Sequence, residues 1–308
     1  MLARGKVHAL AGRGGIGKTT LMLAISATIS SGDCFPGCVT PTDEGSILYI
    51  SGEDDAGDTL MPRFMASGGE PERIIFMKGL LSIHGQFLSI FDHHLFIEDL
   101  VNETGAVLLV LDPVTEFCGR NIDNNSPTHV RSVLGRLQQI AESTNVAIMG
   151  ITHLTKHREG AQVDRVLGSG AWTHAPRIVW GVVEDDSKYL GLMKSNVSPV
   201  DQVYPYRLSP AVAERVEVHH ATIGKRIPGA QLSDYLDIAE SERGRKIVNA
   251  CDYIHEKLSE GPALKQDVVR KLIDSGMSKS TIKRAAREVG VKSERENKTH
   301  GSAVWSLK

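Results

Sequence analysis

The sequence lacks a long hydrophobic run, a strong net charge and enough cysteine for a disulfide framework. Its longest uninterrupted apolar stretch, Ala106–Leu111, is far too short to span a bilayer, and its N-terminus has no signal-peptide pattern. Four cysteines in 308 residues are typical of a reduced, cytoplasmic protein. Because the formal net charge is only −2, any nucleic-acid surface must be a local patch. We therefore expect a cytoplasmic protein with no membrane partner.

What the sequence does contain is one strong motif near the N-terminus. Residues 12–19, GRGGIGKT, match G-x-x-x-x-G-K-[ST], the phosphate-binding loop of P-loop NTPases. The context fits, because Lys6–Ala11 is predicted to be a buried strand and Thr19–Ser30 a helix. Backbone N–H groups of such a loop and of the helix N-terminus bind phosphates, Lys18 adds a positive charge, and the Thr19 hydroxyl suits Mg²⁺. The predicted nucleotide-binding residues are Gly12, Gly14, Gly15, Ile16, Gly17, Lys18, Thr19 and Thr20.

Hydrophobic runs and amphipathic segments alternate over the first half of the chain. The runs Ser46–Ser51, Ile74–Met77, Ala106–Leu111 and Val146–Ile151 are typical of strands that are covered on both faces. Segments with helical periodicity separate them, which predicts a doubly wound α/β fold with a parallel sheet. Beyond residue 176, four strand-like segments with short turns predict an antiparallel extension: Ile178–Val183, Tyr189–Met193, Val203–Leu208 and Arg215–Val218.

The last part of the chain follows a different pattern. Residues 224–243 are polar and contain Pro228-Gly229, which predicts a linker. Three helical segments follow at Arg245–Ser259, Lys265–Ser275 and Ser278–Val289, and two short strand-like ends follow them. We therefore predict a P-loop α/β domain at 1–223, a linker at 224–243 and a winged helix-turn-helix domain at 244–308.

Acidic side chains and a histidine follow three of the predicted strands. Asp112 ends the run AVLLVLD, the pattern of a Walker B acid that holds Mg²⁺ through water. Glu53 is a candidate for orienting and deprotonating the attacking water, and Asp54 and Asp55 beside it leave the choice open. His153 is a candidate sensor of the γ-phosphate. We expect them at one edge of the sheet, where ligands bind. An ordinary strand-end acid, a solvated acidic loop and a surface histidine are the alternative readings.

The ordered set of motifs resembles the RecA-like hexameric ATPases of plasmid and phage replication, most closely the RepA-type replicative helicases, which are related to the DnaB-like group. The resemblance covers about residues 6–210 and is carried by GRGGIGKT, SGED, VLD, ITHLTK, LGSGAW at 167–172 and KSN at 194–196. It implies a RecA-like fold, ATP bound with Mg²⁺ between the subunits of a homo-hexameric ring, and loops that face a channel for single-stranded DNA. By position it implies that Glu53 is the catalytic glutamate, Asp112 the Walker B acid and His153 the γ-phosphate sensor.

The same resemblance implies positive charge supplied by the neighbouring subunit. Lys194 lies where DnaB-like relatives carry a lysine near a β-hairpin, which makes it a candidate for this role. Asn196 stands where those relatives carry an arginine finger, so Arg207, on the next strand, or Arg177 is the candidate substitute. An arginine at the surface or at the edge of the core is the alternative reading of both.

Basic residues that could bind DNA lie in two regions. Two predicted loops follow the catalytic strand tips and carry side chains that could bind the phosphates of single-stranded DNA: Arg120, Lys156, Arg158 and Arg165. The third C-terminal helix carries basic residues at three-to-four-residue spacing, as a DNA-recognition helix does: Lys279, Lys283, Arg284 and Arg287. Solvated loops with incidental charge, and a C-terminal module that binds a replication protein, are the alternatives.

Two functional hypotheses follow from these features. The first is an ATP-driven ring motor on single-stranded DNA, a replicative helicase or translocase. The second is an ATP-switched DNA-binding, helicase-loading or regulatory protein that uses its C-terminal module for recruitment. Glu53, Asp112 and His153 together favour an active ATPase, whereas Asn196 in place of the arginine finger favours slow or partner-dependent turnover. A small-molecule kinase is disfavoured, because we find no arginine-rich lid and no substrate pocket.

Overall fold

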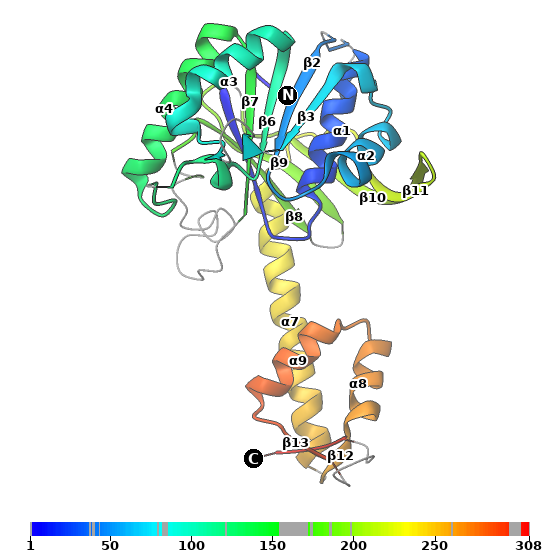
Figure 1. Cartoon of the computed structure of the whole chain (residues 1–308). Coiled ribbons are helices and arrows are strands. Elements are labelled where there is room, and N and C mark those ends of the chain that lie inside the picture. The colour runs from blue at the N-terminus through cyan, green and yellow to red at the C-terminus, as the bar shows by residue number, and fades with distance from the viewer. Residues whose placement is uncertain are drawn as a thin grey trace. The chain divides into compact units, whose positions relative to one another are not determined.

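The computed structural model describes residues 2–36, 38, 41–42, 44–78, 80–81, 86–120, 122–153, 172, 175–184, 187–197, 199–259, 261–295 and 303–307. The chain forms two compact units, Met1–Leu236 and Asp237–Lys308 (Figure 1). Within the described residues, no helix has the length and apolar character that crossing a membrane requires.

The first unit is built on a nine-stranded sheet in the part of the chain that the structure describes, with the strand order β11-β10-β9-β8-β1-β7-β6-β2-β3. The neighbouring strands β8, β1, β7, β6, β2 and β3 are parallel to one another. The pairs β8–β9, β9–β10 and β10–β11 are antiparallel. The predicted parallel core with an antiparallel extension is therefore confirmed. The strands are β1 (Val7–Gly12), β2 (Ser46–Ser51), β3 (Ile74–Lys78), β6 (Ala106–Asp112), β7 (Ala147–His153), β8 (Ile178–Glu184), β9 (Lys188–Lys194), β10 (Val203–Ala213) and β11 (Val216–Ile223).

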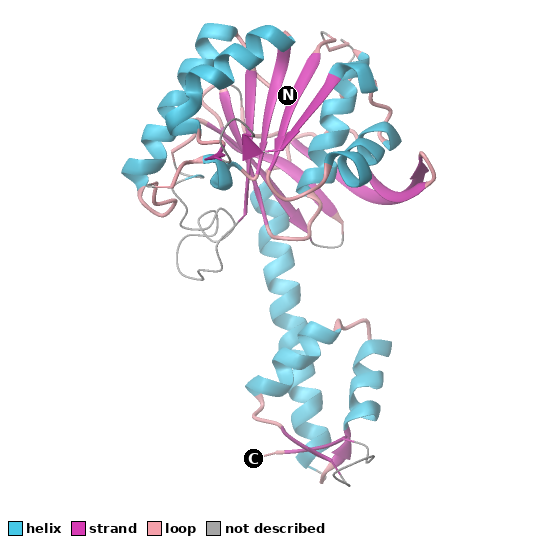
Figure 2. Ribbon diagram, viewed as in Figure 1, coloured by secondary structure: helices cyan, strands magenta, loops and turns pink. Residues whose placement is uncertain are grey.

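Helices cover both faces of this sheet, which explains why its central strands are continuously apolar (Figure 2). Alternate residues of β2 enter opposite cores: Ile47 and Tyr49 pack on the side of α1 and α2, and Leu48 and Ile50 pack on the side of α3 and α4. The helices are α1 (Lys18–Ser31), α2 (Met61–Ala66), α3 (Ile90–Thr104) and α4 (Pro127–Thr144), with the short turns η1 (Ala56–Leu60), η2 (Pro71–Arg73) and η3 (Val114–Phe117) and the small hairpin β4 (Leu80–Leu81) and β5 (Gln86–Phe87).

The last two strands of the extension are longer than predicted. β10 and β11 form a hairpin that turns at Glu214 and Arg215, both of which have positive φ, of 48° and 70°. Two residues in this conformation make a tight turn that matches the twist of a hairpin. Neither residue is a glycine or an asparagine, so the sequence carried no turn signal at this position.

The structure differs from the predicted linker at 224–243, because the helix α7 (Leu232–Ser259) begins inside it. Leu232 is buried where Gly181 and Gly191 face each other across β8 and β9, and a Cβ on either glycine would lie within 2.8 Å of its side chain. The Tyr235 ring stacks on that of Tyr189, with 4.0 Å between centroids. The first turn of α7 is therefore packed on the sheet of the first unit.

The second unit contains the predicted helices and terminal hairpin. Its elements are the C-terminal part of α7, α8 (Lys265–Asp274), α9 (Lys279–Glu288) and a sheet of order β12-β14-β13, made of Ala263–Leu264, Ala303–Ser306 and Lys292–Arg295. Residues four apart on α7, Ala250, Ile254 and Leu258, are buried against α8, α9 and Trp305. This unit therefore has a hydrophobic core of its own, and its assignment as a winged helix-turn-helix stays a prediction.

A candidate nucleotide site at the carboxyl edge of the sheet

The P-loop leaves β1 and enters α1 in a conformation that depends on glycine. Gly15 and Gly17 have φ values of 76° and 94°, the left-handed region that other residues rarely adopt. Helix α1 begins at Lys18 with no side-chain hydrogen bond from its N-cap Gly17 and no acidic residue in its first turn. The N-terminal amides of α1 therefore lack a side-chain cap of their own, and this is the arrangement in which a helix binds an anion. The residues present fit the phosphates of a nucleotide.

Lys18 lies within the loop. Its side chain is buried, and Nζ donates hydrogen bonds of 3.0 Å to the carbonyl oxygens of Gly12 and Arg13. Burial lowers the pKa of Lys18 from 10.5 to about 8, and the carboxylates of Asp112 and Glu53 oppose that shift. The two acids that were predicted from separate strand tips therefore both act electrostatically on the P-loop lysine.

The metal side of the site is formed by Asp112 and Thr19. Asp112 ends β6 and is buried, and its carboxylate accepts hydrogen bonds from the Thr19 hydroxyl and, at 2.7 Å, from Tyr49 Oη. Burial raises the pKa of Asp112, and the two hydrogen bonds oppose this rise. Burial also raises the pKa of Tyr49 well above its ordinary value, so that its hydroxyl keeps the proton and donates. A hydroxyl and a carboxylate in contact are suitable oxygen ligands for Mg²⁺, directly or through water.

The three acids after β2 have different surroundings. Asp54 forms an ion pair with Arg63 at 3.3 Å, and Asp55 pairs with Lys78 at 2.6 Å and accepts a hydrogen bond from the Gly57 amide. Glu53 is exposed, and its charge acts on both Lys18 and Asp112. Of the three, Glu53 is the acid whose charge acts on both Lys18 and Asp112, and its role as the base stays a prediction.

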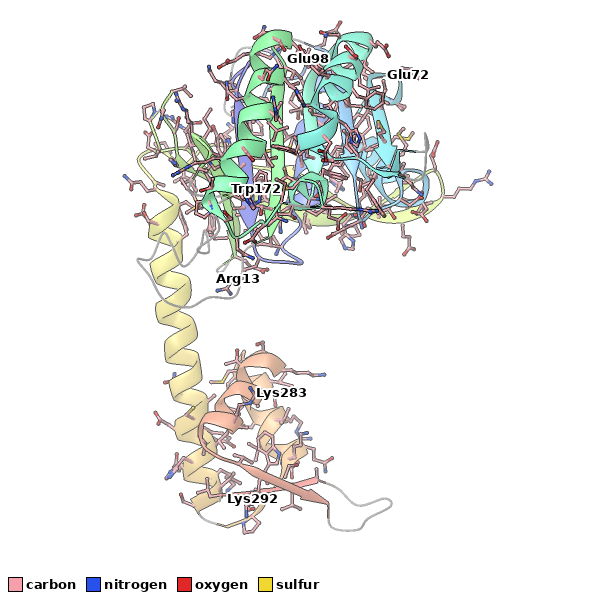
Figure 3. The ribbon with its side chains drawn as sticks, turned by 60° about the vertical axis from the view of Figure 1, so that its left-hand side comes forward. Arg13, Glu72, Glu98, Trp172, Lys283 and Lys292 are labelled. Carbon is pink, nitrogen blue, oxygen red and sulfur yellow. The ribbon has the colours of Figure 1, made fainter. Side chains whose placement is uncertain are left out.

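A pocket of about 250 Å³ lies beside Glu53, between the ends of β2 and β3, the residues that precede α3, and η3. Glu116 of η3 lines it, and a Cβ on Gly52 would collide with the Glu116 carboxylate. Because that carboxylate is the far end of a flexible side chain, a larger residue at position 52 would displace the Glu116 side chain. Figure 3 shows Arg13 of the P-loop at the opposite end of the sheet from Glu72, which precedes β3.

The AAA domain family matches residues 1–159, which is just over half of the chain. The chain belongs to the AAA domain family. The fold and the family together make it a RecA-like P-loop ATPase. A solved structure with a similar fold is that of a KaiC-like protein from the hyperthermophilic archaeon Pyrococcus horikoshii OT3, at 20% identity and a TM-score of 0.45, covering 70% of this chain and 90% of that chain. No curated protein matches this chain.

In this AAA-domain protein the predicted sensor, His153, is the last residue of β7 and pairs in register with Gly12 of the P-loop strand. Its backbone is therefore at the nucleotide edge, and its side chain lies outside the described residues. Lys156, Arg158 and Arg165 also lie outside them. Arg120 is exposed in the loop after η3.

The loop that carries Arg120 is connected to Trp172, the last residue of the LGSGAW segment. Trp172 is buried, and its indole N–H donates to Asn124 Oδ1 at 3.3 Å (Trp172 is labelled in Figure 3). The side-chain amide of Asn124 in turn donates to the carbonyl oxygen of Thr115 in η3 at 3.1 Å. Asn124 therefore links Trp172, which follows the second predicted DNA loop in the chain, to η3, the turn that carries Glu116.

The candidates for a contact in trans are on the antiparallel extension. Lys194 is the last residue of β9 and is half-buried, whereas Arg207 on β10 and Arg177 before β8 are exposed. Their roles stay predictions, since each needs a neighbouring subunit.

In the second unit, three of the four basic residues predicted on α9 are exposed, namely Lys279, Lys283 and Arg287. Arg284 also lies on α9, and its side chain is outside the described residues. Ile282, Ala285 and Ala286 of the same helix are buried, so the side chains of Lys279, Lys283 and Arg287 lie away from the core.

The support of the P-loop by the antiparallel extension was not predicted from the sequence. Tyr206 Oη on β10 donates to the carbonyl oxygen of Ile16 at 2.9 Å, and a Cβ on Gly17 would lie 2.6 Å from Leu208. Tyr49, which holds Asp112, was missed as well. Both tyrosines lie in apolar strand runs, where a tyrosine signals burial but does not name the partner of its hydroxyl.

Proposed function

We propose that this chain is an ATP-hydrolysing RecA-like motor that acts on single-stranded DNA, a replicative helicase or translocase. The observation that carries the proposal is the convergence at one sheet edge. The P-loop, the Thr19–Asp112 pair and Glu53 meet there, and both segments predicted to contact DNA begin there, after β6 and after β7. An ATP site at the sheet edge where the strands preceding both candidate DNA segments end is what a nucleic-acid-driven ATPase needs.

In this proposal, each step of ATP hydrolysis depends on particular residues of the site. Amides of the P-loop and of α1 bind the phosphates, with Lys18 on the outer ones, and Thr19 and Asp112 would hold Mg²⁺. Mg²⁺ held by these two residues would neutralise the negative charge that develops on the phosphates during transfer. Glu53 orients the attacking water and accepts its proton. Lys194 and Arg207 supply positive charge to the site of the next subunit in a homo-hexameric ring.

A second function is favoured by the second unit. Its exposed basic residues Lys279, Lys283 and Arg287 lie on one helix over a separate core, as in a winged helix-turn-helix that binds duplex DNA. In this alternative, ATP only switches assembly, and the second unit recruits DNA or a replication protein.

The deciding experiment is steady-state ATP hydrolysis with and without single-stranded DNA, with Lys18→Ala and Glu53→Gln as inactive controls. The motor proposal predicts strong stimulation by DNA that both substitutions abolish. Slow turnover that is indifferent to DNA would rule the motor out for this chain alone and leave the ATP switch.

The ring is tested by mixing two inactive variants. Arg207→Ala and Lys18→Ala each remove one side of a shared site, so a mixed ring regains sites in which an intact P-loop faces an intact Arg207. Activity in the mixture above that of either variant supports a trans role for Arg207. Activity that only averages the two variants contradicts it.

A further inference from the structure

Two buried tyrosines donate hydrogen bonds to the two halves of the nucleotide site. Tyr49 on β2 bonds to the Asp112 carboxylate at 2.7 Å, and Tyr206 on β10 bonds to the carbonyl oxygen of Ile16 at 2.9 Å. The two side chains are only 0% and 4% exposed. A phenylalanine would supply the same ring to the core, whereas a buried hydroxyl is unfavourable unless it is hydrogen-bonded. The position of each hydroxyl therefore calls for an explanation beyond packing.

The Tyr49 hydroxyl fixes the carboxylate of Asp112. A carboxylate at a strand end can rotate about its terminal bond, and a metal site requires one orientation of its oxygens. Tyr49 bonds Oδ2, and the Thr19 hydroxyl bonds the same carboxylate. Asp112 is thereby held against the other predicted Mg²⁺ ligand. Among the described hydrogen bonds, Tyr49 makes none to the P-loop, so loss of its hydroxyl should change the binding of Mg²⁺ and not that of the phosphates.

The Tyr206 hydroxyl fixes a peptide group of the P-loop. The Ile16–Gly17 peptide is trans, so its C=O and N–H point in opposite directions. Holding the Ile16 carbonyl toward β10 therefore turns the Gly17 N–H away from β10. Gly17 has φ of 94°, and Leu208 of the same strand packs against it. Tyr206 thus orients one of the loop amides without contacting Asp112 or Thr19 in the described structure.

We propose that Tyr49 and Tyr206 are positioning residues with separate tasks, Tyr49 for the metal side of the site through Asp112 and Tyr206 for the phosphate side through the Ile16–Gly17 peptide. The inference rests on the proposed function only as far as binding of ATP and Mg²⁺ is concerned. It requires neither DNA nor a ring.

The test is ATP binding by calorimetry, with EDTA and across a Mg²⁺ titration, for Tyr49→Phe and Tyr206→Phe in the full chain. Tyr49→Phe should leave ATP affinity in EDTA unchanged. It should raise the Mg²⁺ concentration that gives half of the maximal increase in ATP affinity by about tenfold or more, as loss of a residue that orients a metal ligand does. Tyr206→Phe should weaken ATP binding by about fivefold in EDTA and in Mg²⁺ alike, as loss of one neutral hydrogen bond does, with the Mg²⁺ midpoint unchanged.

Tyr204→Phe is the matched control. Tyr204 is buried two residues from Tyr206 on the same strand, and its hydroxyl has no hydrogen bond to the P-loop among the described contacts. Tyr204→Phe should change neither the ATP affinity in EDTA nor the Mg²⁺ midpoint. Melting temperature and circular dichroism verify the fold of each variant. If Tyr49→Phe does not fold, 3-fluorotyrosine placed at position 49 alters the acidity of the hydroxyl with little change in packing and should still shift the Mg²⁺ midpoint.

The inference is overturned if Tyr49→Phe weakens ATP binding in EDTA, if Tyr206→Phe moves the Mg²⁺ midpoint, or if neither differs from Tyr204→Phe. A wild-type chain that binds no ATP would instead overturn the proposed function. The two failures are therefore distinguishable.

Discussion

The surroundings of the three acids after β2 lead to a quantitative prediction about which of them acts in hydrolysis. Glu53→Gln removes the carboxylate whose charge acts on Lys18 and Asp112 and keeps its shape. A general base contributes about 10²- to 10⁴-fold to a rate, so kcat should fall by at least about a hundredfold. ATP affinity should change little, because binding depends on the P-loop and on the metal side.

Asp54→Asn and Asp55→Asn are the matched controls. Asp54 pairs with Arg63 at 3.3 Å with side chains 38% and 29% exposed, and an ion pair with this exposure contributes about 0.2–1 kcal/mol to stability. Asp55 pairs with Lys78 at the surface. Glu53 acts on both Lys18 and Asp112, whereas Asp54 is among the charges that act on Asp112 and not among the main ones that act on Lys18. Removing the charge of Asp54 or Asp55 should therefore lower kcat much less than Glu53→Gln does, by no more than about fivefold.

The assay is single-turnover and steady-state ATP hydrolysis for the three variants, with ATP affinity measured in parallel. The reasoning is refuted if Asp54→Asn or Asp55→Asn lowers kcat as much as Glu53→Gln does. It is also refuted if Glu53→Gln acts only by weakening ATP binding.

Three further predictions concern the packing of α7 on the sheet, the stimulation of hydrolysis by DNA and the pH dependence of stability. Leu232→Ala should lower the free energy of unfolding of the first unit by about 2–5 kcal/mol in urea titrations, because it empties the space over Gly181 and Gly191. The neighbouring substitution Ser233→Ala is the control and should leave the free energy of unfolding unchanged. Trp172→Phe removes the N–H that bonds Asn124 together with part of a buried ring, so it should reduce stimulation of hydrolysis by single-stranded DNA while basal hydrolysis stays within about twofold, with melting temperature verifying the fold. Unchanged stimulation would contradict the link. Lys18 has a pKa of about 8 in the folded chain and 10.5 when exposed, so the unfolded chain binds the Lys18 proton more tightly. Burial of the charged lysine therefore lowers the free energy of unfolding below pH 8, and this penalty is lost as the pH rises from 8 toward 10.5. The stability of wild type relative to Lys18→Met should therefore rise over that range in denaturant titrations, and a flat difference would contradict it.

The sequence was sufficient to predict the features that depend on local pattern. The glycine motif, the apolar runs of β2 and β6 and the acids at their ends are short-range signals, and the parallel sheet that they imply brings Thr19 into contact with Asp112. The helices of the second unit followed from periodicity in the same way.

The remaining features depend on contacts between residues that are distant in the chain. Tyr206 is 190 residues from Ile16, so no pattern near either residue indicates their hydrogen bond. The N-terminal start of α7 was missed for the same reason: residues 224–243 are polar overall, but Leu232 and Tyr235 pack on β8 and β9, and that packing stabilises the first turn of the helix. Weak local preference was overridden by tertiary contacts.

The antiparallel extension connects two features of the site: the candidate contact of Arg207 with a neighbouring subunit and the hydrogen bond from Tyr206 to the P-loop. Side chains alternate along a strand, so β10 directs Tyr206 and Leu208 toward the P-loop and Arg207 away from it. If Arg207 contacts a neighbouring subunit, the same strand holds the peptide that orients the Gly17 amide. Packed elements move between discrete arrangements rather than deform continuously, so we expect a neighbour that shifts β10 to shift the P-loop as well. In a ring, the arginine in trans would then act on two sites at once: on the phosphates of the next subunit through its charge, and on its own P-loop through Tyr206.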